Sequence, residues 1–416
     1  MDKIEKVKEI LRQNNQESVI KILEKINLPE REKLAEQILN TDFTQILALL
    51  ENTNDKHRAN IEPIGYIDKN KLDENEKDKF SKIGEEVIKN NQYAVVTMAG
   101  GQGTRLGFKG PKGAFKLDIG KNGKYIFEIL VDTLKRSKEK YETEVYWYIM
   151  TSVENNKATV DFFEENNYFG YNKEKVKFFI QTVLPLISID DKNLLIDKEY
   201  NIKKASDGNG SIFKSLESTG MLEDMKEKGI KWVYVCGVDN IMANMVDTVF
   251  LGLTIDNNCP SASKSVKKSY PEEKVGVFCK KDGKPAVQEY IEMSEEDIHA
   301  KSQDGELLYG ESNIVSHLFN IESIEKLSRV KLKYHRAEKK NSYINENLEE
   351  INPEVPNSYK FEAFIFDGFE YLDDMLVLRV NREEEFAPIK NAEGVDSPET
   401  AKVIYEENKR RERENG

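Results

Sequence analysis

Glycines and two basic residues are concentrated in a short segment that directly follows an apolar run. The run covers residues 93–98, and residues 98–107 read MAGGQGTRLG, with Lys112 close behind. Glycine has no Cβ, so backbone N–H groups in such a loop can approach an anion closely. Arg105 and Lys112 add positive charge that can contact phosphate oxygens. The segment is therefore predicted to bind phosphate.

The two best-known phosphate-binding loops do not match this segment. The Walker A loop requires Lys-Ser or Lys-Thr after its second glycine, and neither Gly103 nor Gly107 is followed by that pair. The dinucleotide fingerprint requires its third glycine three residues after the second, whereas Gly107 comes four residues after Gly103. A plain glycine turn is the alternative, which the flanking basic residues and the position after a strand disfavour.

A carboxylate follows a second apolar run, residues 232–236. Asp239 lies in the sequence GVDN just after that run. Mg²⁺ commonly binds through one or two carboxylates together with substrate phosphates, so Asp239 is a candidate metal ligand. An aspartate after a strand is also often a helix cap or a turn residue, and the residue alone leaves both interpretations open. The segment 206–211, SDGNGS, is by itself most simply a turn that leads into a helix.

Other reactive residue types are scattered along the chain. The three cysteines are far apart, so they indicate neither a disulfide framework nor a zinc site. The histidines lack metal-ligand spacing and are expected to be structural or solvated, and a cluster of lysines is expected on a solvated face. These residues are Cys236, Cys259 and Cys279, then His57, His299, His317 and His335, and finally Lys264, Lys267 and Lys268.

The composition restricts the class of protein. The 416 residues are 38 % hydrophobic and 33 % charged, which allows a sizeable core and roughly two domains of about 100–200 residues. No apolar run approaches the roughly 20 residues that cross a bilayer, and the N-terminus lacks the layout of a signal peptide. A net charge of −13 argues against binding nucleic acid. We expect a cytoplasmic protein that binds neither membranes nor nucleic acids.

The spacing of apolar residues predicts the elements that position these groups. Residues 1–90 read mainly as amphipathic helices, with a polar linker at 52–60. Beyond residue 93, short apolar runs alternate with helical stretches, which predicts a mainly parallel sheet with helices on both faces. Residues 398–414 are expected to form a charged, solvated terminal helix. The expected strands are 93–98, 145–150, 176–180 and 232–236, and the expected helices are 126–135, 157–166 and 211–226.

The glycine segment and the Pro111-Lys112-Gly113 that follows it resemble the signature of the sugar-nucleotide uridylyltransferases. Further segments resemble the UDP-N-acetylhexosamine pyrophosphorylase branch, in order and at similar spacing, over roughly residues 60–405. So many ordered matches make chance similarity negligible. The segments include Gln181 with Leu184-Pro185, Asp207-Gly208-Asn209-Gly210, Gly237-Val238-Asp239-Asn240, Val275-Gly276-Val277, Gln288-Glu289-Tyr290, Asn313-Ile314, Phe364-Ile365-Phe366-Asp367, and the run from Arg382 to Ala392.

The resemblance implies an α/β fold in three consecutive regions. These are a helical N-terminal region (1–90), a nucleotide-diphospho-sugar-transferase domain with a Rossmann-like, mixed and mainly parallel sheet (91–345), and a short C-terminal region (346–416). The implied reaction joins UTP and an N-acetylhexosamine 1-phosphate to give UDP-N-acetylglucosamine or UDP-N-acetylgalactosamine and pyrophosphate. The sugar phosphate would attack the α-phosphorus of UTP directly, with Mg²⁺ as cofactor. The expected assembly is a monomer.

The resemblance also implies a role for each matching residue. Cations are expected to act in catalysis, Asp239 to hold the metal, and aromatic rings to line the pocket for the acetyl group. The expected catalytic residues are Arg105, Lys112 and Lys390. The expected nucleotide-binding residues are Ala99, Gly100, Gly101, Gly103, Thr104, Gln181 and Gly208, and the expected sugar-binding residues are Asn209, Gly276, Glu289, Asn313, Phe364 and Phe366.

Two other activities stay open at this point. Residues 310–312 depart from the family pattern just before Asn313, beside the expected sugar, so a uridylyltransferase for glucose 1-phosphate or galactose 1-phosphate is an alternative. The second alternative is a sugar-nucleotide-binding protein without turnover. The intact set of expected cations and metal ligand argues against that second alternative.

Overall fold

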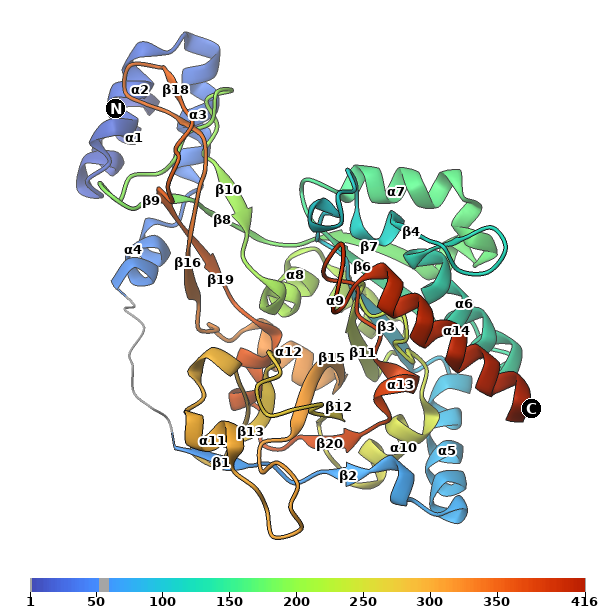
Figure 1. The fold of residues 1–416 in the computed structure, drawn as a ribbon. Coiled ribbons are helices and arrows are strands. Elements are labelled where there is room, and N and C mark those ends of the chain that lie inside the picture. The colour runs from blue at the N-terminus through green and yellow to red at the C-terminus, as the bar shows by residue number, and fades with distance from the viewer. Residues whose placement is uncertain (1, 52–59, 416) are drawn as a thin grey trace. The chain divides into compact units, whose positions relative to one another are not determined.

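The computed structural model describes residues 2–51 and 60–415. The linker expected at 52–60 lies almost entirely outside the described residues, as does His57. The chain forms two compact units (Figure 1). The three regions proposed from the sequence are consecutive stretches of chain, whereas each of these units combines separated stretches. The three-region division stays a prediction. Unit 1 comprises Met1–Arg58, Thr182–Ser211 and Leu332–Phe364, and unit 2 comprises Ala59–Gln181, Ile212–Lys331 and Ile365–Gly416.

An 11-stranded sheet forms the centre of unit 2 (Figure 1). Its main path runs β2-β20-β12-β15-β11-β3-β6-β7, and β1, β13 and β14 pair beside that path. β11, β3, β6 and β7 are parallel neighbours, whereas β15 runs antiparallel to both β11 and β12. The predicted mainly parallel α/β sheet is therefore confirmed. The strands are β1 (Ile61–Pro63), β2 (Ile67–Asp68), β3 (Tyr93–Met98), β6 (Tyr146–Thr151), β7 (Val176–Ile180), β11 (Trp232–Gly237), β12 (Ser261–Lys267), β13 (Val277–Lys281), β14 (Lys284–Gln288), β15 (Glu311–Asn320) and β20 (Leu376–Arg379), with a separate pair β4 (Lys116–Leu117) and β5 (Lys124–Tyr125).

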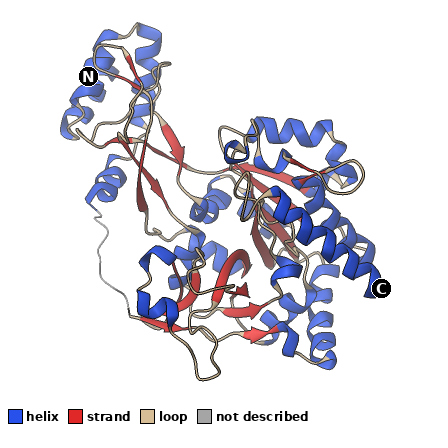
Figure 2. Cartoon of the chain, in the orientation of Figure 1, coloured by secondary structure: helices blue, strands red, loops and turns tan. Residues whose placement is uncertain are grey.

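Helices cover both faces of this sheet (Figure 2). Successive side chains of a strand point to opposite faces. In β15, Leu318 joins the core that also contains Leu130 of α6. The next residue, Phe319, places its ring 5.4 Å from that of Phe213 in α8, so α6 and α8 pack on opposite faces. The helices of unit 2 are α5 (Glu74–Lys89), α6 (Ile126–Tyr141), α7 (Asn156–Glu165), α8 (Ile212–Ser218), α9 (Met221–Glu227), α10 (Thr248–Asp256), α11 (Glu295–His299), α12 (Ile321–Ser328), α13 (Arg382–Glu385) and α14 (Pro398–Asn415).

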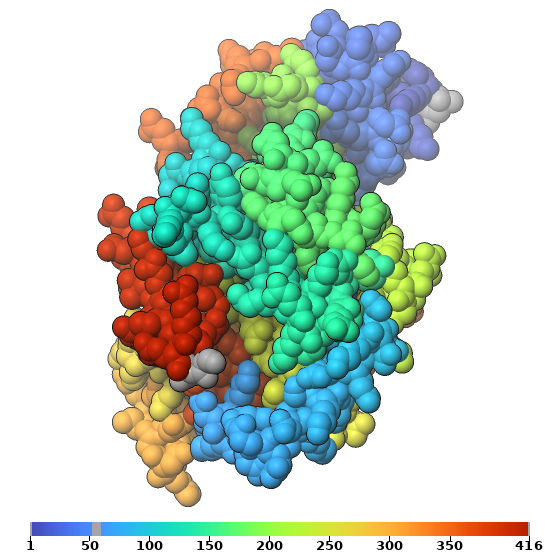
Figure 3. All heavy atoms as spheres, turned by 90° about the vertical axis from the view of Figure 1, so that its right-hand side faces the viewer, coloured from blue at the N-terminus to red at the C-terminus, as the bar shows by residue number. Residues whose placement is uncertain are grey.

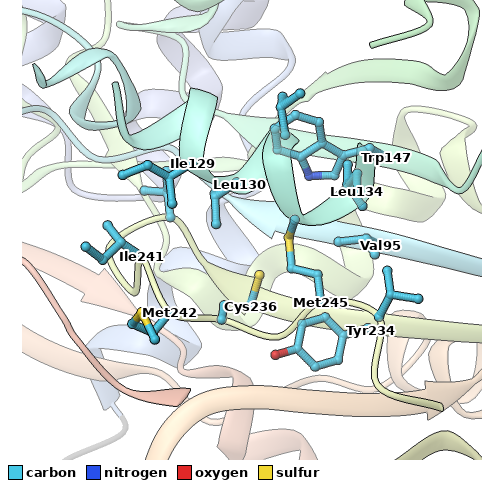
Figure 4. Packing of buried hydrophobic residues seen from close by; sticks show 14 of the residues in the cluster. Val95, Ile129, Leu130, Leu134, Trp147, Tyr234, Cys236, Ile241, Met242 and Met245 are labelled. Atoms are coloured by element: carbon cyan, nitrogen blue, oxygen red, sulfur yellow. The ribbon is translucent and has the colours of Figure 1, made fainter. Parts of the chain in front are cut away.

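The larger core lies where the sheet meets α6 (Figure 4). All six residues of β3 are buried, as expected for a strand that is covered on both faces. Trp147 of β6 is fully buried in this core, and its Nε1 donates a hydrogen bond to Thr97 Oγ1 at 2.8 Å. The polar atom of this large side chain is therefore paired, and the bond ties β6 to β3.

Two expectations about the surface are wrong. The helix expected at 398–414 is present as α14, but Ala401 and Tyr405 are buried in the core, so it is more than a solvated tail. Figure 3 shows its outer side at the surface. Lys264 was expected on a solvated face and is fully buried in β12. The burial is tolerated because the carboxylates of Asp247 and Glu385 neutralise its charge.

Unit 1 combines the N-terminal helices with strands from two later segments. The helices bury apolar residues at helical spacing and confirm the predicted helical N-terminal region. Gln16 joins the segments: its Nε2 donates to Lys192 O at 3.1 Å, and its Oε1 accepts from the Leu194 N–H at 2.8 Å. No helix among the described residues of either unit is long and apolar enough to cross a membrane. The elements of unit 1 are α1 (Lys3–Gln13), α2 (Glu17–Lys25), α3 (Leu28–Leu39), α4 (Phe43–Glu51), β8 (Val183–Pro185), β9 (Ile187–Ser188), β10 (Lys204–Ser206), β16 (His335–Lys339), β17 (Tyr343–Ile344), β18 (Glu350–Ile351) and β19 (Ser358–Glu362).

Candidate functional site

The carboxyl ends of four neighbouring parallel strands meet at one edge of the sheet in unit 2. Backbone hydrogen bonds continue just past the strands and fix the first residues of the loops there. The Gln181 N–H, after β7, donates to Thr151 O at 2.8 Å, and the Ala99 N–H, after β3, donates to Met150 O at 2.7 Å. The Val238 N–H, after β11, donates to Met98 O at 3.1 Å. Gln181, the glycine segment and Asp239 therefore lie along one edge, as their positions after apolar runs predicted.

The glycine segment folds back on itself into a compact loop. The Gly103 N–H donates to Gly110 O at 2.9 Å, and the Lys112 N–H donates to Gly101 O at 3.1 Å. A Cβ on Gly103 would lie 2.7 Å from the ring of Phe108, so only glycine fits there. A Cβ on Gly101 would meet nothing within 4 Å, so this position is open toward the surroundings. Gly101, Thr104 and Arg105 are exposed, as a loop that receives a ligand requires.

Gln181 approaches the loop from the end of β7. It is 7 % exposed, and its Oε1 lies 2.8 Å from where a Cβ on Gly100 would stand. Gly100 therefore leaves the space that this amide occupies. The contact brings two predicted nucleotide-binding residues together, while their role in binding stays a prediction.

Asn155 holds the loop, although no motif in the sequence singles it out. This side chain is fully buried, and its Nδ2 donates to Ala99 O at 2.9 Å and to Gly101 O at 3.3 Å. Its Oδ1 accepts from the Ser152 N–H at 2.8 Å. One amide thus connects the end of β6 with the start of the glycine loop. The only signal in the sequence is a polar residue shortly after the run 145–150.

The basic residues of the loop carry charge that the protein does not neutralise. Within residues 2–51 and 60–415, the side chains of Arg105 and Lys112 form no hydrogen bond or ion pair. Burial lowers the pKa of Lys112, an effect that the Asp239 carboxylate opposes and that the positive charges of Lys390 and Arg105 reinforce. Asp239, Lys390 and Arg105 thus each lie close enough to Lys112 to interact with it electrostatically. They form a cationic cluster in a protein of net charge −13, which favours binding of an anion.

Asp239 and Lys390 are brought together by a backbone contact. The Ile389 N–H donates to Asp239 O at 2.9 Å, so Lys390 follows directly on a segment that is bonded to the Asp239 turn. Lys390 Nζ lies 3.3 Å from Asp396 Oδ2.

The described residues include no group of three or more His, Cys, Asp or Glu side chains that could hold a metal ion. Asp239 therefore fits a metal held by one carboxylate together with phosphates, and it does not fit a cage made by protein alone.

Three predicted sugar-binding residues also lie together in unit 2. The Asn313 N–H donates to Gly276 O at 2.8 Å, and a Cβ on Gly276 would stand 2.9 Å from Glu289 Oε1. β15 pairs antiparallel with β11, with Ser316 opposite Cys236, so residues before 316 continue past the carboxyl end of β11. Gly276, Glu289 and Asn313 therefore lie toward the same edge of the sheet as Asp239. Phe366 belongs to this unit too, in the 3₁₀ helix Ile365–Tyr371.

The backbone beside Asn313 is strained. Val315 has a φ of +55°, a conformation that β-branched residues rarely adopt. Its N–H donates to Asn313 Oδ1 at 2.9 Å, and the facing strand β12 has an irregular register between Ser263 and Ser265. Strain of about 1–3 kcal/mol per residue persists where surrounding structure enforces it, often at functional sites. Val315 is a second residue that no motif in the sequence singles out, and nothing in the local sequence signals it.

Unit 1 holds the remaining predicted residues, Gly208, Asn209 and Phe364. Gly208 has a φ of +90°, and a Cβ there would stand 2.1 Å from Ala363 O. The Ala363 N–H donates to Asp207 O at 2.8 Å, and the Gly210 N–H donates to Ala363 O at 2.9 Å. The DGNG turn is therefore bonded to the chain next to Phe364, so the structure places these three residues side by side within unit 1.

Comparison with known proteins gives consistent matches over most of the chain. A family model described as UTP–glucose-1-phosphate uridylyltransferase matches residues 40–400. UDP-N-acetylglucosamine diphosphorylase 2 of Arabidopsis thaliana is 35 % identical over 421 residues, covering 95 % of this chain and 82 % of the relative. The UDP-N-acetylglucosamine pyrophosphorylase of Saccharomyces cerevisiae is 36 % identical over 411 residues, covering 95 % and 85 %.

A solved structure is similar over almost the whole chain. It is the crystal structure of the uridine diphosphate N-acetylglucosamine pyrophosphorylase from Trypanosoma brucei in complex with an inhibitor. The TM-score is 0.81 at 29 % sequence identity, and the match covers 97 % of this chain and 84 % of that chain. The similarity therefore includes the sheet and the loops at its carboxyl edge.

Replacing Asn155 with alanine is expected to destabilise the protein. The change leaves the buried Ser152 N–H and the Ala99 carbonyl without this partner, which costs about 1–3 kcal/mol per unsatisfied group, whereas Gly101 O keeps its bond from the Lys112 N–H. Urea unfolding of Asn155→Ala measures the loss in free energy of unfolding. Asn166→Ala is the matched control, since its side-chain amide donates to Phe162 O of its own helix and has no other hydrogen-bond partner in the described part of the chain. An equal loss in both variants would contradict the special role of Asn155.

Proposed function

The chain belongs to the UTP–glucose-1-phosphate uridylyltransferase family, among the UDP-N-acetylglucosamine pyrophosphorylases, and from this we propose that it makes UDP-N-acetylglucosamine from UTP and N-acetylglucosamine 1-phosphate. It is a UTP:sugar-1-phosphate uridylyltransferase that releases pyrophosphate. The observation that carries the proposal is the cluster of Arg105, Asp239 and Lys390 about Lys112 at the carboxyl edge of the sheet. We further propose that it acts as a monomer in the cytoplasm.

The chemistry needs few protein groups, and the site matches this need. The attacking oxygen belongs to the sugar phosphate and is already anionic near neutral pH, so no general base has to remove a proton. Orientation of the two substrates can lower the barrier by about 7–11 kcal/mol. Neutralisation of charge at the α-phosphate adds about 2.7–4 kcal/mol per group, by analogy with oxyanion holes. Arg105 and Lys112 support this role because they lack partners within the described chain.

We assign the two ends of the nucleotide to different parts of the site. The glycine loop from Ala99 to Thr104 would bind the phosphates and the ribose, because Gly101 and Thr104 are exposed and the loop directly follows the carboxyl end of β3. Gln181 would contact the uracil, and its contact with Gly100 of the glycine loop supports this assignment. For Gly208, the nucleotide-binding role stays what the resemblance implies.

Mg²⁺ is the cofactor we propose for this site. Asp239 would hold it together with phosphate oxygens of the substrate, since a single carboxylate at the end of β11 suits a hard cation that shares its ligands with phosphates. When bound, the ion neutralises charge on the transferred phosphate group.

The preference for an N-acetylated sugar is assigned to Gly276, Glu289 and Asn313. Asn313 Oδ1 accepts from the Val315 N–H, which fixes the amide and leaves its NH₂ group to donate to a ligand. Phe366, in the same unit as Asn313, would shelter the acetyl methyl group. For Asn209 and Phe364 of unit 1, the sugar-binding role stays what the resemblance implies. A pocket for glucose or galactose needs neither an amide donor nor an apolar niche at this position.

A panel of sugar 1-phosphates tests the proposed function directly. The protein is mixed with UTP, Mg²⁺ and the 1-phosphates of N-acetylglucosamine, N-acetylgalactosamine, glucose or galactose, and pyrophosphate release is followed. We expect the fastest release with an N-acetylated sugar. A preference for glucose 1-phosphate or galactose 1-phosphate would support the alternative uridylyltransferase, and no release with any sugar would support a binding protein without turnover.

Removing the unpaired cations is expected to damage catalysis without damaging the fold. Arg105→Ala and Lys112→Ala should each lower kcat/KM at least tenfold, which corresponds to about 1.4 kcal/mol of transition-state binding. Neither change breaks an ion pair within the described chain, so thermal unfolding should be little affected. Lys109→Ala, an exposed lysine of the same loop, is the control and should resemble the wild type. Wild-type kinetics in both test variants would exclude contact with phosphate.

The metal assignment predicts a specific change in Asp239→Asn. The backbone bond between Asp239 O and the Ile389 N–H is kept, so the fold should persist. Loss of the negative charge should raise the Mg²⁺ concentration for half-maximal rate by at least about fivefold, because a carbonyl is a poorer ligand than a carboxylate. A titration that matches the wild type would reassign Asp239 to turn structure.

Sugar choice is expected to depend on Asn313. Asn313 is half-buried, and an amide that a bound sugar shields from water without pairing it costs about 1–3 kcal/mol, so the wild type should disfavour glucose 1-phosphate by roughly 5- to 150-fold. Asn313→Ala should remove most of that preference and leave the KM for UTP nearly unchanged. Competition between the two sugar 1-phosphates measures the ratio. An unchanged ratio in the variant would show that another residue selects the sugar.

A further inference from the structure

Four charged side chains form a closed group in unit 2, outside the residues assigned above. Lys264 Nζ lies 2.8 Å from Asp247 Oδ2 and 2.5 Å from Glu385 Oε2. Lys69 Nζ lies 2.8 Å from the same Asp247 oxygen and 3.3 Å from Glu385 Oε1. Lys264 is fully buried, Asp247 and Glu385 are nearly so, and Lys69 is half-buried. We call these four residues the ion cluster.

All four side chains of the ion cluster are ionised, and their two positive and two negative charges cancel. Burial alone would raise the pKa of Asp247, but Lys264 and Lys69 hold it well below its usual range. Burial would likewise lower the pKa of Lys264, but Asp247 and Glu385 raise it. A buried ion pair often stabilises a fold no more than well-packed apolar residues of similar volume. Stability alone therefore gives no reason for four charges at this place.

The ion cluster is connected to the phosphate end of the site through one short segment. Glu385 ends α13, and its backbone O accepts from Asn240 Nδ2 at 2.8 Å. Asn240 Oδ1 accepts in turn from the Ala387 N–H at 3.0 Å. Two residues on, the Ile389 N–H donates to Asp239 O. Residues 385–389 are thus bonded along the Asp239 turn, and Lys390 comes next.

The other members of the ion cluster belong to rigid elements. Asp247 is the N-cap of α10, and its Oδ1 accepts from the Phe250 N–H at 3.1 Å. Lys264 stands in β12, in the interior of the sheet, and its ammonium lies 5.3 Å from the ring centre of Phe250. The ion cluster therefore attaches residues 385–389 to the sheet and to a helix, whereas the segment itself is mostly loop.

We propose that Lys264 and Lys69 are positioning residues, which act through Glu385 and Asn240 to hold Lys390 and the Asp239 turn in the geometry that phosphate binding requires. This inference rests on the proposed function for its catalytic part. Its structural part, that the ion cluster holds residues 385–390 in place, can be measured without any substrate.

Variants of the two lysines separate positioning from general stability. Lys264→Met removes the buried charge, and Lys69→Met is a milder change at a half-buried position, so at least one should fold. Lys69→Arg keeps the charge and should resemble the wild type. Tyr171→Phe is the control for lost stability, since it removes a buried hydrogen bond to Val145 O at 2.7 Å. That bond lies before the amino ends of β6 and β7, away from the carboxyl ends where the candidate site lies.

Hydrogen exchange and steady-state kinetics give the two readouts. In Lys264→Met, exchange of the Ala387 and Ile389 amides should be at least about tenfold faster than in the wild type. The Mg²⁺ concentration for half-maximal rate should rise at least about fivefold and kcat should fall, while the KM for the sugar phosphate stays near the wild-type value. Lys69→Met should change both readouts in the same direction by less. Tyr171→Phe should lower the melting temperature and change neither readout.

The outcomes distinguish this inference from the proposed function. Wild-type exchange in both methionine variants would overturn it, as would equal acceleration in Tyr171→Phe. Faster exchange with unchanged kcat and Mg²⁺ dependence would also overturn positioning and leave a purely structural cluster. A wild type that releases no pyrophosphate with any sugar 1-phosphate would overturn the proposed function, and exchange would still decide whether the ion cluster holds the segment.

Discussion

The parallel register between β3 and β11 is the constraint on which the candidate site depends. It sets Met98 opposite Gly237, so both strands end at the same level and the glycine loop and the Asp239 turn leave the sheet next to each other. A slip of one residue would turn every side chain of a strand to the other face. The buried side chains on both faces of β3 therefore hold the register that places the candidate site, and the bond from Trp147 to Thr97 holds β6 beside β3 in the same way.

Within the one sheet of unit 2, the buried charges of the ion cluster are paired, whereas a charge at the carboxyl edge is not. At the ion cluster, each buried charge meets an opposite one, and the side chains are held in one arrangement. At the sheet edge, Lys112 is partly buried with no ion-pair partner in the described chain, and its pKa falls. An unneutralised ammonium in a half-buried place is unfavourable for the free protein and favourable once an anion binds. The same contrast separates the residues that hold the framework from the residues that we propose to bind phosphate.

Features that depend on neighbouring residues could be predicted from the sequence, and features that depend on distant contacts could not. The glycine loop and Asp239 directly follow apolar runs, so their place at strand ends could be inferred from order alone. Asn155 acts on residues 56 and 54 positions away, and Lys264 meets Glu385 across 121 positions, so no local pattern reveals either role. Val315 is β-branched, which predicts an extended backbone rather than the positive φ it adopts.

The composition of unit 1 affects both the synthesis of the chain and its response to proteolysis. It is assembled from three separated stretches, so the chain passes between the units five times, after residues 58, 181, 211, 331 and 364. During synthesis, the N-terminal helices are made about 300 residues before β19, the last strand that packs with them. Their apolar faces stay exposed in that interval, and exposed apolar surface promotes aggregation. Proteolytic removal of those helices would likewise expose the apolar sides of two internal segments rather than release a self-contained domain.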